Sequence, residues 1–122
     1  MERRALIGLK PLKTSDGAAA PQASYLRLPT VTANVPRPGG QRGVMTVETG
    51  IDAPDAALRA RVAQSVPRLR AAYAAVVQRA AATLRPGFPP DVERLVAELQ
   101  AATNTTLGRA GARLLIGTVM VV

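Results

Sequence analysis

The longest hydrophobic pattern in the chain runs from Asp55 to Leu84 and has the period of a helix. Its apolar positions lie three or four residues apart, at Leu58, Val62, Val66, Leu69, Tyr73, Val76, Ala80 and Leu84. This spacing gathers them on one helix face, which must pack against another part of the protein. Pro67 falls inside the pattern, where a proline removes a backbone hydrogen bond at a cost of about 3 kcal/mol. The pattern therefore predicts one long helix, bent at Pro67, that wraps a surface.

Two segments before this helix alternate between apolar and polar residues, as strands do. The first covers 24–35, with Pro29 near its start, and the second covers 44–51. The turn formers of 36–43 join them, which predicts an antiparallel hairpin. The expected core face of the second strand carries Met45, Val47, Thr49 and Ile51.

Prolines and a glycine in 85–90 end the long helix, and a second helix is predicted over 91–107. Asp91 is its expected N-cap, and Gly108 and Gly111 are candidate stop signals. The last segment, 112–122, is apolar on both alternating faces. Leu114, Ile116, Thr118, Met120 and Val122 are expected on one face, and Leu115, Gly117, Val119 and Val121 on the other. Such a segment suits a central strand, or a strand whose outer face meets a partner.

The element order is therefore ββααβ, which is typical of an α+β fold. We expect a three-stranded antiparallel sheet with two helices packed on one face, formed by a single domain over 24–122. Residues 1–23 show no sustained period and are predicted to be a flexible tail or a degenerate export signal. Arg3 and Arg4 precede a short apolar stretch, as in a twin-arginine signal, but Lys10 interrupts it.

Composition removes several classes of chemistry. The chain contains no histidine and no cysteine, which excludes the Ser-His and Cys-His nucleophile systems and most metal sites. Glu48 and Asp52 are the nearest approach to a carboxylate pair, but Asp52 reads better as part of a helix start. The glycines of 39–43 fit a hairpin turn, because they precede a strand and lack a Walker ending. We expect no catalytic, cofactor-binding or metal-binding residues, and hence no enzyme.

The net charge of +8 favours an anionic partner. A candidate partner surface brackets the apolar stripe of the long helix and consists of Arg59, Arg61, Arg68, Arg70 and Arg79. Such a surface suits an acidic protein or anionic lipid headgroups. Nucleic acid is disfavoured, because the arginines form no contiguous basic face and the chain has only three aromatic residues. A basic module that binds nucleic acid or anionic lipid remains the alternative function. No apolar run of about 20 residues exists, so no transmembrane helix is predicted.

The region from Tyr25 to Val122 resembles the periplasmic domain of the flagellar basal body-associated FliL family. The matching segments are Tyr25–Pro29, Val44–Val47, Ser65–Ala72 with the internal Pro67, Leu107–Gly108, and the closing strand Leu114–Val122. The resemblance rests on the order and spacing of these segments and on the internal proline.

This resemblance implies a non-enzymatic interaction or structural domain with a stomatin-like fold. It further implies a periplasmic or inner-membrane-peripheral location in a bacterium, and association with the flagellar motor or the cell envelope. Expected partners are flagellar stator or envelope proteins, with lateral self-association into a homo-oligomer as a further implication.

Overall fold

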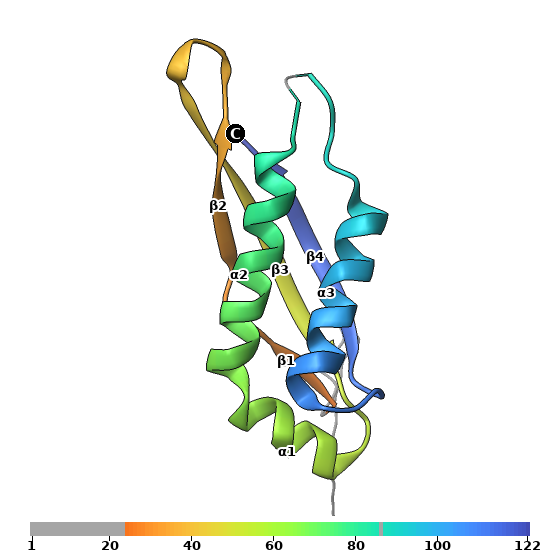
Figure 1. Ribbon diagram of the computed structural model, residues 1–122. Coiled ribbons are helices and arrows are strands. Elements are labelled where there is room, and N and C mark those ends of the chain that lie inside the picture. Colours follow the sequence, from red (N-terminus) through yellow and green to blue (C-terminus); the bar gives the residue numbers. More distant parts are fainter. Residues whose placement is uncertain (1–23, 86) are drawn as a thin grey trace, which may run out of the picture.

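The computed structural model describes residues 24–85 and 87–122, so the tail or export signal predicted over 1–23 lies outside the described residues. The fold is α+β with an antiparallel sheet, as predicted, but it has four strands and three α-helices where three and two were expected. Helices α2 and α3 run side by side over one face of the sheet, and α1 crosses its lower end (Figure 1).

The strands are β1 (Tyr25–Arg27), β2 (Val31–Pro36), β3 (Arg42–Asp52) and β4 (Arg113–Val121). The helices are α1 (Ala56–Gln64), α2 (Val66–Ala82) and α3 (Val92–Leu107), and a short 3-10 turn, η1 (Pro38–Gly40), lies in the β2–β3 connection. None of the helices in the described part of the chain is long and apolar enough to span a bilayer.

The extra strand arises because the first predicted strand is broken. β1 and β2 follow one another along the same edge of β3, pairing with its residues 50–52 and 42–47. Pro29 lies in the break and has no N–H group to offer a ladder. Leu28 turns its side chain into the core there, and its N–H donates to the carbonyl of Thr49 at 3.1 Å.

The single long helix predicted over 55–84 is wrong, because it is two helices that meet at Ser65. The Ser65 N–H donates to the carbonyl of Val62 at 3.0 Å, and the Ser65 carbonyl accepts from Leu69 N at 2.9 Å. Ser65 therefore ends α1 and begins α2. Pro67 falls in the first turn of α2, where an N–H has no helical partner in any case. The chain avoids the interior proline penalty by starting a new helix.

The predicted helix signals at the other ends are confirmed. Asp55 Oδ2 accepts from Leu58 N at 2.8 Å at the start of α1. Asp91 Oδ1 accepts from Arg94 N at 3.0 Å at the start of α3. Gly108 follows α3 with a φ of 78°, a left-handed conformation that glycine adopts without a Cβ clash.

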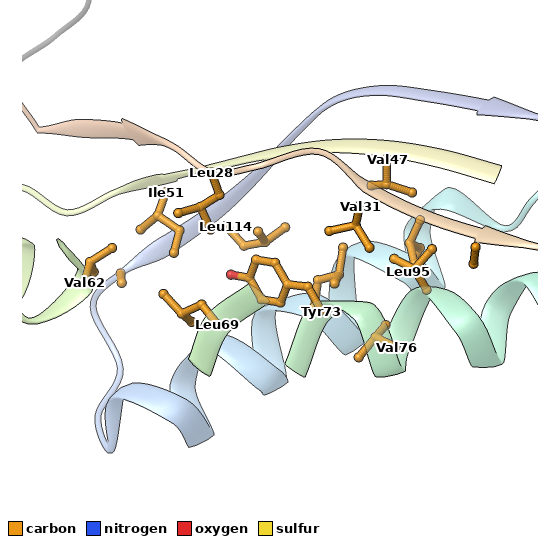
Figure 2. Close-up of a cluster of buried hydrophobic side chains, with 14 of the residues drawn as sticks. Leu28, Val31, Val47, Ile51, Val62, Leu69, Tyr73, Val76, Leu95 and Leu114 are labelled. Carbon is orange, nitrogen blue, oxygen red and sulfur yellow. The ribbon is translucent and has the colours of Figure 1, made fainter. Parts of the chain in front are cut away.

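The core lies between the sheet and the helices, where Figure 2 shows Tyr73 among aliphatic side chains from both layers. The predicted core face of β3 is confirmed, since Met45, Val47, Thr49 and Ile51 are all buried. The helical stripe is also confirmed over most of its length. Its buried members are Leu58, Val62, Leu69, Tyr73 and Val76.

β4 is an edge strand, so of the two positions predicted for the last segment the central one is wrong, and a strand whose outer face meets a partner remains a prediction. It pairs with β3 alone among the described strands, and β3 is the central strand. The strict alternation predicted for 112–122 is also wrong, because the register shifts between Val47 and Thr49. Beyond this irregularity Val119 and Val121, and not Met120, lie opposite the core residues of β3.

Candidate functional site at the edge of the sheet

The outer edge of β4 is one of the two unpaired edges of the described sheet, the other being formed by β1 and β2. No described strand pairs with it. From Leu114 to Val122 it carries neither a charged residue nor a proline. Soluble proteins usually protect a sheet edge with charges, prolines or a covering element. An uncharged edge of this length is a template for another strand.

Gln100 of α3 occupies the first part of this edge in the manner of a strand. Its Nε2 donates to the carbonyl of Ala112 at 2.8 Å, and its Oε1 accepts from Leu114 N at 2.9 Å. A side-chain amide thus supplies the donor and acceptor that a neighbouring peptide group would supply. These bonds show that Leu114 directs its backbone groups away from β3.

Further along β4, other residues also direct their backbone N–H and C=O groups away from β3. Residues two apart present their backbone groups to the same side, so Ile116 also faces outward. At the other end Val122 exchanges two hydrogen bonds of 3.0 Å with Val44 of β3 and therefore faces inward. Its neighbour Val121, and Val119 two residues earlier, consequently face outward. Past Gln100, the edge offers three residues whose backbone groups point away from the sheet.

A shallow groove of about 810 Å³ runs beside this edge, between β4 and α3. Its walls are mostly apolar, and Glu93 and Arg113 are its charged members. Val92 is 42% exposed on the helix side, and Val96, Ile116 and Val119 are half-buried. An added strand would find room here for the side chains on one of its faces, as in β-augmentation sites.

The structure distributes the five predicted arginines over two helices, with Arg59 and Arg61 on α1 and Arg68, Arg70 and Arg79 on α2. Arg59 is tied down at the start of α1, where Nη1 donates to the carbonyls of Ala53 at 3.0 Å and Pro54 at 3.3 Å. Arg68 closes the helix junction by donating from Nη2 to Ser65 Oγ at 2.9 Å.

The other three predicted arginines are exposed. Arg61 lies on α1 and Arg70 on α2, whereas Arg79 lines a separate cleft of about 440 Å³ near the far end of α2. Because the helix is broken at Ser65, the five do not form the two parallel rows that a continuous helix would give. As a partner surface they remain a prediction.

The cleft beside Arg79 joins α2, α3 and the segment between them. Arg85 and Arg94 also line it, together with the acidic residues Asp91 and Glu98 and with apolar residues that include Met45. Arg94 Nε is paired with Glu98 Oε2 at 3.0 Å. The guanidinium of Arg85 stacks 4.8 Å from the centroid of the Phe88 ring. The cleft thus combines cationic, acidic and apolar groups.

The carboxylates of the described chain are spread over the fold. Asp55 and Asp91 cap helices, and Glu48 lies 3.8 Å from Arg27 on the sheet face away from the helices. No three acidic residues within 24–85 and 87–122 approach one another closely enough to hold a metal ion.

A comparison of the chain with protein-family models found no match, and a comparison with curated proteins found none either. The geometry of the β4 edge is therefore the main indication of function. Sequence reasoning missed the role of Gln100 and the edge position of β4. The uncharged run 114–122 was the available signal, and it also fitted a central strand.

Proposed function

We propose that this chain is a non-enzymatic interaction domain that binds an extended segment of another protein along β4. The observation that carries the proposal is the open, uncharged edge of β4 beside the apolar groove of α3. Main-chain hydrogen bonds to Ile116, Val119 and Val121 would provide affinity, and the groove would select side chains. Gln100 marks where the added strand must stop, because its amide already fills the edge at Leu114.

The partner is proposed to be acidic. With a net charge of +8, the chain attracts an acidic segment and repels a second copy of itself. The exposed Arg61 and Arg70 add to this field without lying in the groove. A second copy of this chain is thus a less favoured occupant of the edge than an acidic partner.

In the cell, we propose a FliL-like role in the periplasm or at the periphery of the inner membrane of a bacterium, with a flagellar stator or envelope protein as the partner. A stomatin-like classification of the fold belongs to the same proposal. The order of elements, the antiparallel sheet and the paired helices on one face support it.

A deletion strain tests this role. Fractionation is expected to place the protein in the periplasm or with the inner membrane, and the deletion is expected to impair swimming or envelope integrity. Wild-type protein should restore the phenotype. Val119→Lys should fail to restore it, because the lysine puts a charge into the groove. Thr32→Lys, an exposed substitution on β2, is the matched control and should restore it. Normal swimming together with a purely cytosolic protein would refute the role.

A cross-linking experiment identifies what occupies the edge. Because the chain has no cysteine, Val119→Cys and Thr32→Cys each provide one attachment point for a photo-crosslinker. We expect an adduct with a stator or envelope protein from position 119 and none from position 32. An adduct of two copies of this chain from position 119 would show that self-association, and not a foreign partner, uses the edge.

A further inference from the structure

Four of the six large apolar residues exposed in the described chain lie at one end of the molecule. We call this end the tip. It is the end where β2 turns into β3, β4 finishes and α2 connects to α3 (Figure 1). The four residues, with their exposed fractions, are Val44 (37%), Phe88 (62%), Met120 (51%) and Val122 (68%). They come from three separate segments of the chain.

The apolar side chains bracket the tip on two sides. Val44 and Val122 are directly paired, and Met120 lies two residues from Val122 on the same strand face. This is the sheet face that no described helix covers. Phe88 belongs to the α2–α3 connection, on the helix side. Val44, Met120 and Val122 project from the uncovered sheet face, and Phe88 borders the cleft of about 440 Å³ on the helix side.

Cationic side chains accompany these projections. Arg37 comes from the β2–β3 connection, Arg42 is the first residue of β3, and Arg85 comes from the α2–α3 connection. The described chain has no acidic residue before Glu48, and Asp91, the acid nearest to Phe88 in sequence, caps α3. Arg85 stacks on Phe88 at 4.8 Å, which places a charge directly beside an apolar ring, as interfacial residues do.

We propose that the tip docks on an anionic lipid bilayer, with its apolar side chains in the headgroup region and its arginines among the lipid phosphates. Projecting apolar residues ringed by basic ones are what such a surface selects. A nucleic acid would use the arginines but gain nothing from Met120 or Val122. The proposal rests on the membrane-peripheral part of the proposed function and specifies the surface that makes the contact. The β4 edge ends at the tip, where Val121 lies between Met120 and Val122, and its part around Ile116 runs away from the tip and stays open to a protein partner.

Vesicle binding of the full chain tests the charge component. We compare vesicles of phosphatidylcholine with about one-third phosphatidylglycerol against vesicles of phosphatidylcholine alone, expecting binding only to the anionic ones. Removing tip charge with Arg42→Gln and Arg85→Gln should weaken binding about 25-fold, from roughly fivefold for each arginine near the surface. Arg61→Gln and Arg70→Gln remove the same charge far from the tip and should change binding by only a few fold. Equal losses from the two pairs would overturn the proposal.

Insertion is tested by fluorescence. Because the chain has no tryptophan, Phe88→Trp and Tyr25→Trp place one fluorophore at the tip or at the opposite end, both at exposed aromatic positions. Anionic vesicles should shift the emission of Phe88→Trp to the blue and leave Tyr25→Trp unchanged. Thermal unfolding checks that each variant folds. An unchanged Phe88→Trp spectrum at vesicle saturation would overturn the proposal.

Nucleic acid is the competing outcome. If duplex DNA binds more tightly than the vesicles, and Met120→Ser weakens neither, the tip is not a lipid site. The outcome for the proposed function is separate. Loss of function in Val119→Lys with no vesicle binding would leave the interaction domain standing and remove the lipid site. If the protein binds vesicles but Val119→Lys keeps full function, the lipid site stands and the proposed role of the β4 edge is refuted.

Discussion

The hydroxyl groups of Tyr73 and Thr103 share a buried hydrogen bond that joins α2 to α3. Both side chains are fully buried. Thr103 Oγ1 also donates to the carbonyl of Leu99 at 2.8 Å. A threonine hydroxyl has one proton, so Tyr73 must be the donor to Thr103. Because Tyr73 is the donor and Thr103 the acceptor, removing one hydroxyl should lower the free energy of unfolding by a different amount than removing the other.

Thr103→Val should destabilise the protein more than Tyr73→Phe does. The valine leaves the Tyr73 hydroxyl buried with no acceptor, at a cost of about 1–3 kcal/mol, whereas phenylalanine removes the donor itself and costs about 1 kcal/mol. Urea unfolding of the two single variants and the double variant measures this. The double variant should lose less than the sum of the single losses, and strict additivity would contradict the coupling.

Tyr73 should also make the protein less stable in strong alkali. Burial raises its pKa above the ordinary value of 10.0, against an opposing effect of the hydrogen bond with Thr103. Above pH 10 the unfolded chain loses the tyrosine proton while the folded protein keeps it, so the free energy of unfolding falls as pH rises towards the folded pKa. Well below pH 10 the tyrosine is protonated in both states and does not make the free energy of unfolding depend on pH. Unfolding of wild type and Tyr73→Phe between about pH 8 and pH 11 checks the sign, and equal slopes for the two would contradict it.

Gln100→Ala should loosen the start of β4. It removes the partners of Leu114 N and of the Ala112 carbonyl, with an expected loss of about 1–2 kcal/mol. Hydrogen exchange of the Leu114 amide should accelerate well beyond the global change. Gln78→Ala is the matched control, because Gln78 is exposed on α2. If Leu114 keeps its protection in Gln100→Ala, the amide does not act as a substitute strand.

Pro67→Ala should change stability by less than about 1 kcal/mol, since a proline in the first helical turn costs no hydrogen bond and slightly restricts the unfolded chain. Ala71→Pro, at an exposed position inside α2, should cost about 3 kcal/mol. Thermal unfolding of both variants compares them. A large gain for Pro67→Ala would mean that the break at Ser65 is strained and that α1 and α2 prefer to merge.

Much of the fold follows from local patterns. The alternation around Met45 and Val47 identifies the buried face of β3, and the threefold and fourfold spacing identifies the face of α2 that holds Tyr73. Asp55 and Asp91 mark helix starts correctly. These signals work because capping and amphipathic burial act between residues that are close in sequence.

The candidate site was less predictable. Among the five arginines of the predicted partner surface, Arg59 and Arg68 bond to their own helix starts. The helix start that Arg68 uses exists only because of the break at Ser65. A continuous apolar stripe looks the same whether one helix or two carry it. The clamp of Gln100 on β4 joins residues 14 positions apart, and no local pattern signals it.

By itself the sequence determined the α+β class, the buried faces of β3 and of the helices, and the helix caps, because the last two reflect interactions within a few residues. Only the tertiary structure decided that β4 closes the sheet as an edge and that Val44, Phe88 and Met120 meet at one tip. An apolar strand suits a central or an edge position equally well. Its place depends on which distant strand pairs with it and on what the helices leave uncovered.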